Sequence, residues 1–405
     1  MRKIGILLIV FLLCLATRET VQRQEEWESV IPRKKEKTIG TEIRVVLMTD
    51  NFEDTTHSEI RVSSAHGLVL FYGNESEDVN AGEIVQINAM DARFANGTIR
   101  IVPKEETDKL TLQHMRRSYG VPSYYGELEL FKDEERIAIV NQLPLETYLR
   151  FVVPSEMPSS YEMEALKAQA ICARTYAYAK LHAEAYPQYK AHVDDSTSFQ
   201  VYGNIENNPR TDRAVNETEA ECVWDGEKVA NTYFFSTSCG NTTSVAVVNE
   251  IGEAYERDLP WYRWSVTVSK VELERILEAY SGKEIGTLQE LIISENGEGG
   301  IVHRIKAIGN EGEIEVKTEN KIRRALADRS LSIQRQDGSV VSCTNLLPSA
   351  FFTIIDEGSN YRILGGGYGH GTGLSQNGAN EMAKNGKTYL EILMFFYPNT
   401  KVVSI

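Results

Sequence analysis

Glu156 is the residue of this sequence whose setting best suits acid–base chemistry. It stands within the stretch Leu143 to Ala179 and is framed by Pro154 and Pro158. Proline fixes φ and removes a backbone donor, so this pair predicts a short irregular turn that aims the carboxyl group. A turn carboxylate in water is the plainer interpretation of any single Glu of this kind. The local residues alone leave both interpretations open.

A glycine-rich stretch near the end of the chain is the second candidate for chemistry. Residues Gly365 to Ala379 read GGGYGHGTGLSQNGA. The stretch contains no GK[ST] of a phosphate loop and does not fit the GxGxxG register, which excludes nucleotide binding. So many glycines indicate positive φ and a close backbone approach, either to another strand or to a ligand.

Metal chemistry finds little support in the spacing of possible ligands. The chain has five cysteines, which do not make a disulfide framework at this length. Four of them show neither CxxC spacing nor a close His partner. These are Cys172, Cys222, Cys239 and Cys343. His192, Asp194 and Asp195 also lack a defined coordination spacing, so a solvated loop explains them better. We therefore predict no bound metal and no cofactor.

A long helix is expected to follow Glu156 and to support it. Ser159 and Glu162 have the spacing of a capping box, which predicts that the helix begins there and runs past Ala179. Small apolar residues cover most of its sides and leave a narrow polar stripe that includes Lys167 and Arg174. This composition predicts a buried central helix against which other backbone packs closely.

The remaining patterns predict an α+β fold, with a β-rich body around the buried central helix and an α+β insertion. Short alternating runs from Thr41 to about Val102 indicate strands, and a hairpin is expected with its turn at Lys132 to Glu135. Mixed helix and strand periodicity follows Ala246. The expected divisions are a signal-anchor (1–18), a polar tether (19–40), a core in two parts (41–245 and 346–405) and the insertion (246–345).

The start of the chain indicates export. Arg2 and Lys3 precede an apolar run from Ile4 to Ala16. At ~1.5 Å per residue this run spans only about 20 Å of a ~30 Å hydrocarbon core. A signal peptide that is cleaved after secretion is therefore the alternative to an uncleaved anchor with an extracytoplasmic body. We expect a single-pass anchor in the cell membrane.

The charge balance bears on the class of partner. The formal net charge is −15, and no cluster of Lys and Arg occurs in the body of the chain. Phosphate binding needs such clusters, so nucleic acid is excluded as a partner.

The residues around Glu156 form a specific pattern. LPLExYLxxVVPSEMP followed by EALKAQAxxARTYA resembles the SpoIID/LytB family of bacterial cell-wall proteins. The ending GHGxGxSQxGA resembles the C-terminal signature of the same family, and the similarity spans roughly 41–245 and 346–403. Phe151 stands where the family usually has Gly, and Cys239 replaces a Gly of its STSGG loop. Some members carry zinc before the DSTxxQVY motif, but this chain has Phe199 there, so no such metal is predicted.

The resemblance implies a lytic transglycosylase that cleaves glycan strands freed of stem peptides and forms 1,6-anhydromuramic ends. Glu156 would first protonate the leaving oxygen and then, as a base, take the proton of the 6-hydroxyl. The glycine-rich stretch is expected to fold back against Glu156. The implied substrate contacts are Arg174, Gln200, Tyr202, Ser236, Ser238, His370, Ser375 and Gln376. Glu146 suits a structural role better than that of a second acid.

Two alternatives stay open at this point. A non-catalytic wall protein, similar to the amidase-enhancer branch of the family, would bind glycan and stimulate a separate amidase. A Ser or Cys hydrolase built on Cys239 and His370 is disfavoured, because no nucleophile elbow is recognisable. The expected partners are peptidoglycan glycan strands, an amidase, and membrane proteins of the engulfment machinery of sporulation.

Overall fold

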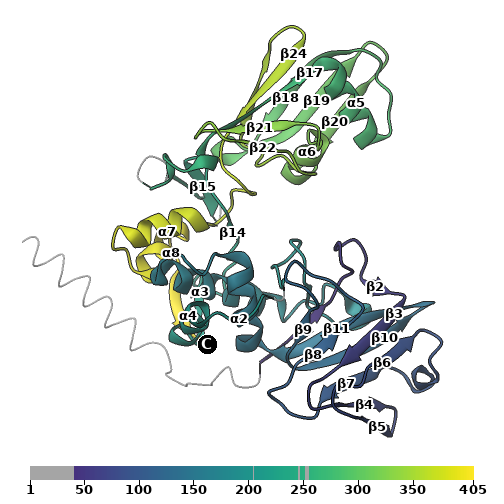
Figure 1. Ribbon diagram of the computed structural model, residues 1–405. Coiled ribbons are helices and arrows are strands. Elements are labelled where there is room, and N and C mark those ends of the chain that lie inside the picture. The colour runs from purple at the N-terminus through teal and green to yellow at the C-terminus, as the bar shows by residue number, and fades with distance from the viewer. Residues whose placement is uncertain (1–40, 204, 245–246, 251–254) are drawn as a thin grey trace, which may run out of the picture. The chain divides into compact units, whose positions relative to one another are not determined.

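The computed structural model of the chain describes residues 41–203, 205–244, 247–250 and 255–405 (Figure 1). The expected anchor and tether lie outside the described residues. Among the described helices, none combines the length and the apolar character needed to cross a membrane. The fold contains both helices and strands in mixed sheets, which confirms the predicted α+β class.

The N-terminal part is built from two sheets. The larger sheet has the order β12-β1-β11-β10-β7-β4-β5, with β2 paired to β11, and the smaller has the order β6-β3-β8-β9. The strands of the larger sheet are β1 (Glu42–Val46), β2 (Thr56–His57), β4 (Leu68–Tyr72), β5 (Glu75–Val79), β7 (Ile99–Pro103), β10 (Glu127–Asp133), β11 (Arg136–Pro144) and β12 (Val193–Asp194). Those of the smaller are β3 (Glu59–Ser63), β6 (Val85–Asn88), β8 (Leu110–Leu112) and β9 (Ser123–Tyr124). The predicted hairpin is confirmed, because β10 and β11 pair as neighbours.

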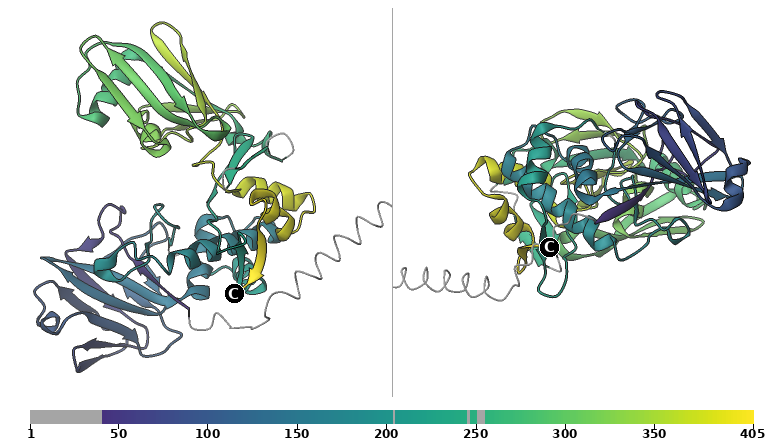
Figure 2. Two further views of the ribbon diagram at one scale, coloured as in Figure 1. Left: turned by 180° about the vertical axis from the view of Figure 1, so that it is seen from behind. Right: turned by 90° about the horizontal axis from the view of Figure 1, so that it is seen from below.

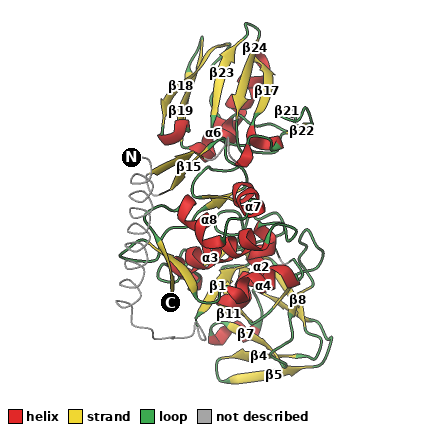
Figure 3. Ribbon diagram, turned by 90° about the vertical axis from the view of Figure 1, so that its left-hand side faces the viewer, coloured by secondary structure: helices red, strands yellow, loops and turns green. Residues whose placement is uncertain are grey.

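A group of helices follows the sheets along the chain. Its members are α2 (Leu145–Glu156), α3 (Met163–Lys180), α4 (Pro209–Glu217), α7 (Gln376–Lys384) and α8 (Tyr389–Phe396). Helix α3 contacts the other four, and Figures 2 and 3 show the C-terminal helices α7 and α8 close to it. Its residues from Ala165 to Ala177 are buried except for Lys167. The buried central helix is therefore confirmed.

Two short strand pairs join distant parts of the chain to this helical group. Strand β13 (Glu221–Trp224) pairs with the C-terminal β26 (Lys401–Ser404), and β14 (Phe234–Phe235) runs parallel to β25 (Leu374–Ser375). The glycine-rich stretch is thereby fixed beside the STSCG segment. A further hairpin consists of β15 (Asn241–Ser244) and β16 (Val247–Glu250).

Two local predictions around Glu156 are wrong. The residue does not lie in an irregular turn, because α2 continues through Pro154 and ends at Glu156. Pro154 lacks the N–H that would bond the carbonyl of Arg150, and the packing of α2 against α3 and α4 offsets this loss. The capping box of Ser159 and Glu162 does not form either: α3 has Glu162 at its N-cap, and no side chain caps the helix.

The insertion has its own core. It consists of the five-stranded sheet β22-β21-β17-β24-β23 and the three-stranded sheet β18-β19-β20, with α5 and α6. The elements are β17 (Trp264–Ser269), α5 (Lys270–Ser281), β18 (Leu288–Asn296), β19 (Val302–Gly309), β20 (Glu313–Lys317), α6 (Glu319–Ala325), β21 (Ser332–Arg335), β22 (Val340–Ser342), β23 (Phe352–Asp356) and β24 (Asn360–Gly365). Trp264 pairs with Gly365, so this sheet extends twenty residues past the boundary expected at residue 345.

The remaining short elements are 3-10 turns. They are η1 (Ala92–Asn96), η2 (Pro187–Tyr189), η4 (Pro260–Tyr262) and η5 (Glu298–Gly300).

Candidate active site

Glu156 is aimed by the end of helix α2. The chain leaves the helix at Met157, which is extended (φ −129°) and fully buried. The carboxylate oxygen Oε1 of Glu156 accepts a hydrogen bond from the backbone N–H of Val201 at 2.6 Å. Burial raises the pKa of Glu156 from its ordinary 4.5 to about 7, although the bond from Val201 acts in the opposite direction. A carboxyl group with this pKa can both donate and accept a proton near neutral pH.

The loop of residues 195–203 holds the carboxylate in place. Besides Val201, it provides Gly203, whose N–H donates to Oγ of Ser155 at 3.2 Å. That hydroxyl in turn donates to the carbonyl of Phe151 at 2.6 Å, within the last turn of α2. The loop therefore binds two side chains at the end of the helix, those of Ser155 and Glu156.

Gln200 and Tyr202 lie in this loop, and both are buried. Gln200 accepts from the hydroxyl of Tyr148 at 3.4 Å and donates to the carbonyl of Ala173 at 3.3 Å. The hydroxyl of Tyr202 donates to Asn141 at 3.1 Å, and its ring packs against Tyr148. These contacts fix the loop to the sheet and to α3. A sugar contact of Gln200 stays a prediction, because this residue lines a pocket. Tyr202 has no exposed surface with which to contact a sugar.

Gln376 connects the C-terminal signature to Glu156. Its Nε2 donates to the backbone carbonyl of Glu156 at 3.0 Å and to Oε1 of Gln169 at 3.4 Å. The expectation that the glycine-rich stretch folds back against Glu156 is thereby confirmed. Gln376 starts helix α7, so the start of that helix determines where this amide group lies.

Ser238 and Ser375 bind a carboxylate that sequence reasoning missed. Glu256 is fully buried and accepts from the N–H of Ser238 at 3.0 Å, from its hydroxyl, and from the hydroxyl of Ser375 at 2.7 Å. Burial raises the pKa of Glu256. Both serine hydroxyls are thus engaged inside the protein. Ser236, by contrast, is only partly buried and accepts from Asn377.

His370 makes two hydrogen bonds to the backbone. The N–H of Thr372 donates to its Nδ1 at 3.1 Å, so Nε2 carries the proton and donates to the carbonyl of Phe234 at 2.9 Å. Burial lowers the pKa of His370. The imidazole is therefore a neutral anchor of the glycine-rich stretch, and both of its nitrogens are occupied.

Arg174 is placed as a structural residue. Its guanidinium is fully buried and forms a two-pronged pair with Glu146, with Nε and Nη2 at 2.7 and 2.9 Å from the carboxylate oxygens. It also donates to the carbonyls of Val215 and Glu221 at 3.1 and 3.2 Å. These partners leave Arg174 little capacity to bind a sugar, and they agree with the structural role expected for Glu146.

A pocket of about 690 Å³ adjoins the loop that holds Glu156. Its lining from the core includes Tyr176, Phe199, Gln200, Tyr233 and His370. The aromatic rings provide flat apolar faces beside hydrogen-bonding groups, a combination that suits sugar rings. The predicted site residues Gln200 and His370 therefore meet at one pocket.

Cys239 does not have the surroundings of a nucleophile. Burial raises the pKa of its thiol, which keeps it protonated. Both ring nitrogens of His370 bind backbone groups, so His370 has no free nitrogen with which to activate the thiol. The geometry offers no support to the hydrolase alternative.

Comparison with known proteins gives two matches to families. Residues 133–224 match the SpoIID family, described as stage II sporulation protein. Residues 213–373 match a domain of unknown function, DUF8618, and this range contains the whole insertion.

The sequences of individual relatives align with most of this chain. An uncharacterized protein of Brachyspira hyodysenteriae is 32% identical over 288 residues, covering 69% of this chain and 72% of the relative. The amidase enhancer of Bacillus subtilis is 28% identical over 297 residues, covering 63% of this chain and 40% of the relative. The stage II sporulation protein D of Bacillus amyloliquefaciens is 27% identical over 285 residues, covering 65% and 75%.

Proposed function

Because the chain belongs to the SpoIID family, we propose that it is a peptidoglycan lytic transglycosylase. Its substrate is the bond between N-acetylmuramic acid and N-acetylglucosamine in glycan strands that have lost their stem peptides. The observation that carries the proposal is Glu156, a partly buried carboxyl group whose pKa is raised to about 7. Such a group is about half protonated at neutral pH.

Glu156 acts first as the acid and then as the base. It protonates the glycosidic oxygen, which becomes the leaving hydroxyl, and it then takes the proton of the 6-hydroxyl of the muramic residue as that oxygen attacks C1. The ring closure replaces the water of an ordinary hydrolysis, so a second carboxylate to activate water is not required. Glu256 has no exposed surface and serves the serines around it instead.

The hydrogen bonding of Glu156 fits these steps. Oε1 is bound by Val201, and within the described part of the chain no hydrogen bond from the protein to Oε2 is found. Oε2 is therefore the oxygen that carries the transferable proton. The bond from Val201 fixes the orientation of the carboxyl plane, and the bond from Gln376 fixes the backbone behind it.

The pocket next to the loop is the proposed binding place for the glycan. Tyr233 is 41% exposed and lines it together with Tyr176. Rings of this kind stack on the apolar faces of sugars, while Gln200 and Thr372 provide polar groups at the same wall. The glycan strand is thus the proposed partner of the pocket.

A second candidate function is that of a non-catalytic enhancer of an N-acetylmuramoyl-L-alanine amidase. The observation that favours it is the similarity to the amidase enhancer of Bacillus subtilis. In this case the pocket binds glycan without cleaving it. A role in wall remodelling and engulfment during sporulation, with an amidase and membrane proteins as partners, belongs to either proposal. So does a location at the cell membrane through residues 1–18.

One assay distinguishes the two candidate functions. The purified chain is incubated with denuded glycan strands, and the products are analysed by mass spectrometry for 1,6-anhydromuramic ends. The transglycosylase predicts such ends with the native chain and none with Glu156→Gln. Absence of these ends from both, together with a faster amidase reaction when the chain is added, supports the enhancer.

A further inference from the structure

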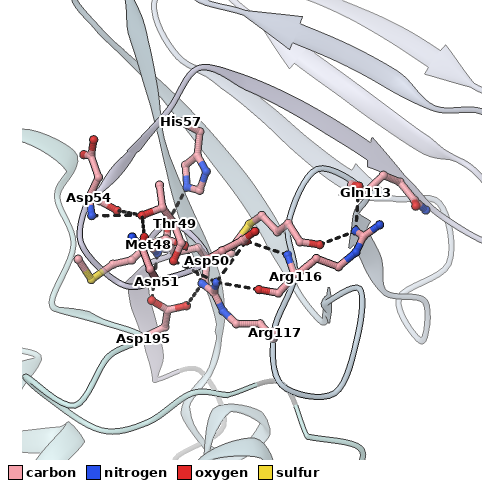
Figure 4. Close-up of polar contacts among 12 residues, drawn as sticks. Met48, Thr49, Asp50, Asn51, Asp54, His57, Gln113, Arg116, Arg117 and Asp195 are labelled. Atoms are coloured by element: carbon pink, nitrogen blue, oxygen red, sulfur yellow. Dashed lines mark hydrogen bonds and ion pairs between the residues drawn. The ribbon is translucent and has the colours of Figure 1, made fainter. Parts of the chain in front are cut away.

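A buried ion pair lies at the foot of the loop that holds Glu156. Nη2 of Arg117 is 2.6 Å from Oδ2 of Asp195, and the two side chains are 2% and 0% exposed. Figure 4 shows Asp195 and Arg117 facing each other next to Met48 and Thr49. Arg117 comes from the segment between β8 and β9, whereas Asp195 directly follows β12. The pair therefore joins two segments that are far apart in the sequence.

Both partners are held by further hydrogen bonds. Arg117 donates to the carbonyls of Met48 at 2.6 Å and Thr49 at 3.2 Å. The other oxygen of Asp195 accepts from the N–H of Met48 at 3.0 Å. The backbone of Arg117 is itself fixed by a reciprocal pair of bonds with Gly120, at 2.8 and 2.9 Å. The guanidinium thus has a defined position from which it can hold Asp195.

Asp195 also closes the loop. Its N–H donates to the carbonyl of Val46 at 3.2 Å, and its own carbonyl accepts from the N–H of Tyr202 at 3.2 Å. Val201 lies immediately before the closing residue Tyr202. The backbone bond between Tyr202 and Asp195 therefore fixes the chain one residue after Val201, whose N–H binds Glu156.

We propose that Arg117 and Asp195 are positioning residues for Glu156: their ion pair fixes the loop that covers the carboxyl group and presents the N–H of Val201 to it. The catalytic consequence rests on the proposed function. The effect on the carboxyl group itself does not, because it concerns the burial and hydrogen bonding of Glu156 in the free protein.

Loosening this loop is expected to change the proton affinity of Glu156. Burial is the larger of the two effects on its pKa, and the bond from Val201 is the smaller. A displaced loop admits water, which stabilises the ionised form. Burial, together with the nearby Glu156, raises the pKa of the hydroxyls of Tyr148 and Tyr176, so these groups stay neutral and do not offset this effect. The pKa of Glu156 should fall toward 4.5.

Two variants test the pair. Asp195→Asn places an amide against the guanidinium and leaves Arg117 with only the exposed Asp50, 3.9 Å away, as a counter-charge, a destabilising change for a buried pair. Arg117→Lys keeps a cation near Asp195 but cannot make all the bonds to Met48 and Thr49, so it weakens the pair while disturbing the fold less than Asp195→Asn does. Asp54→Asn is the matched control, because Asp54 pairs with Arg136 at 3.0 Å on the surface of the same sheet region, with side chains 48% and 43% exposed.

The readout is the pKa of Glu156, followed by carbon-13 NMR of the glutamate carboxyl groups in the full chain and assigned by comparison with Glu156→Gln. We expect a decrease of at least about one unit in Asp195→Asn and a smaller decrease in Arg117→Lys, with no change in Asp54→Asn. If Asp195→Asn does not fold, Arg117→Lys decides. A folded variant of the pair with the native pKa at Glu156 overturns the proposal. An equal decrease of the pKa of Glu156 in Asp54→Asn also overturns the proposal.

The proposed function is tested separately with the same proteins. If the native chain forms anhydro ends, the pH above which activity is lost should move downward by the same amount as the pKa. If the native chain forms none, the transglycosylase proposal fails while the NMR titration still decides the role of the ion pair.

Discussion

The amide nitrogen of Gln376 donates a hydrogen bond to the backbone carbonyl of Glu156 at 3.0 Å, although 220 residues separate the two in the sequence. The two specific motifs of the chain meet in this bond. The insertion, with its own core, lies between them in the sequence. Helix α7 is consequently part of the support of the acid, because Gln376 is its first residue.

Gln376→Ala is expected to reduce kcat by roughly 3- to 10-fold with little change in KM, because one hydrogen bond contributes about 0.5–1.5 kcal/mol. The loss acts on the position of Glu156 and leaves the pocket intact. Steady-state cleavage of denuded glycan measures it. Asn385→Ala, at the exposed end of the same helix, serves as the control and should behave as the native chain. A purely KM effect in Gln376→Ala would argue for direct contact with the sugar.

The pH dependence of cleavage should report Glu156. Its pKa of about 7 means that the acid loses its proton as the pH rises through neutrality. We expect kcat/KM to fall about tenfold per pH unit above 7. His370 should add no limb at higher pH, since burial lowers its pKa from 6.5. A profile from pH 4 to 9 checks this; a midpoint near 4.5 would mean that Glu156 is solvated.

Glu156→Gln should stabilise the fold at high pH. In the native chain the folded state has the higher pKa, about 7 against 4.5, so proton binding stabilises it fully below pH 4.5. This stabilisation is lost as the pH rises through 7, and a neutral Gln avoids the loss. The gain in free energy of unfolding should reach at most about 3 kcal/mol at pH 8 and vanish near pH 4. Denaturant titrations at both pH values measure it, and a gain independent of pH would contradict the assignment.

Arg174→Gln is expected to destabilise the chain by about 3–5 kcal/mol, because it leaves the partner of a buried ion pair uncompensated. Arg174 has no exposed surface, and its bonds to Glu146 link α3 to α2. Arg213→Gln is the control: Arg213 pairs with Glu217 on the surface with its side chain 65% exposed, so less than about 1 kcal/mol is at stake. Chemical denaturation compares the two. A mild effect of Arg174→Gln on stability with a large effect on KM would restore its predicted role in sugar binding.

The sequence allowed the class of fold, the buried central helix and the meeting of the two motifs to be predicted. The small residues of α3 predicted the buried helix, whereas the meeting of the two motifs was expected from the resemblance of both stretches to one family. The helical state of Glu156 was missed because Pro154 weighs against a helix locally, whereas the packing of α2 against α3 and α4 favours one.

The supports of the site were harder to predict. Glu256 lies in a stretch without a recognisable pattern, and its role depends on two serines brought to it by the strand pair β14 and β25. Arg117 and Asp195 are 78 residues apart, and no local signal indicates that they pair. The role of a buried carboxylate can be inferred only when the groups that bind it are known. Such contacts are a property of the tertiary structure.

The most direct test of the account is the search for 1,6-anhydromuramic ends after incubation of the chain with denuded glycan strands. Glu156→Gln must be shown by circular dichroism to remain folded. We expect anhydro ends from the native chain and at least a thousandfold fewer from the variant. Equal amounts of anhydro product from both proteins would contradict the assignment of Glu156 as the catalytic acid.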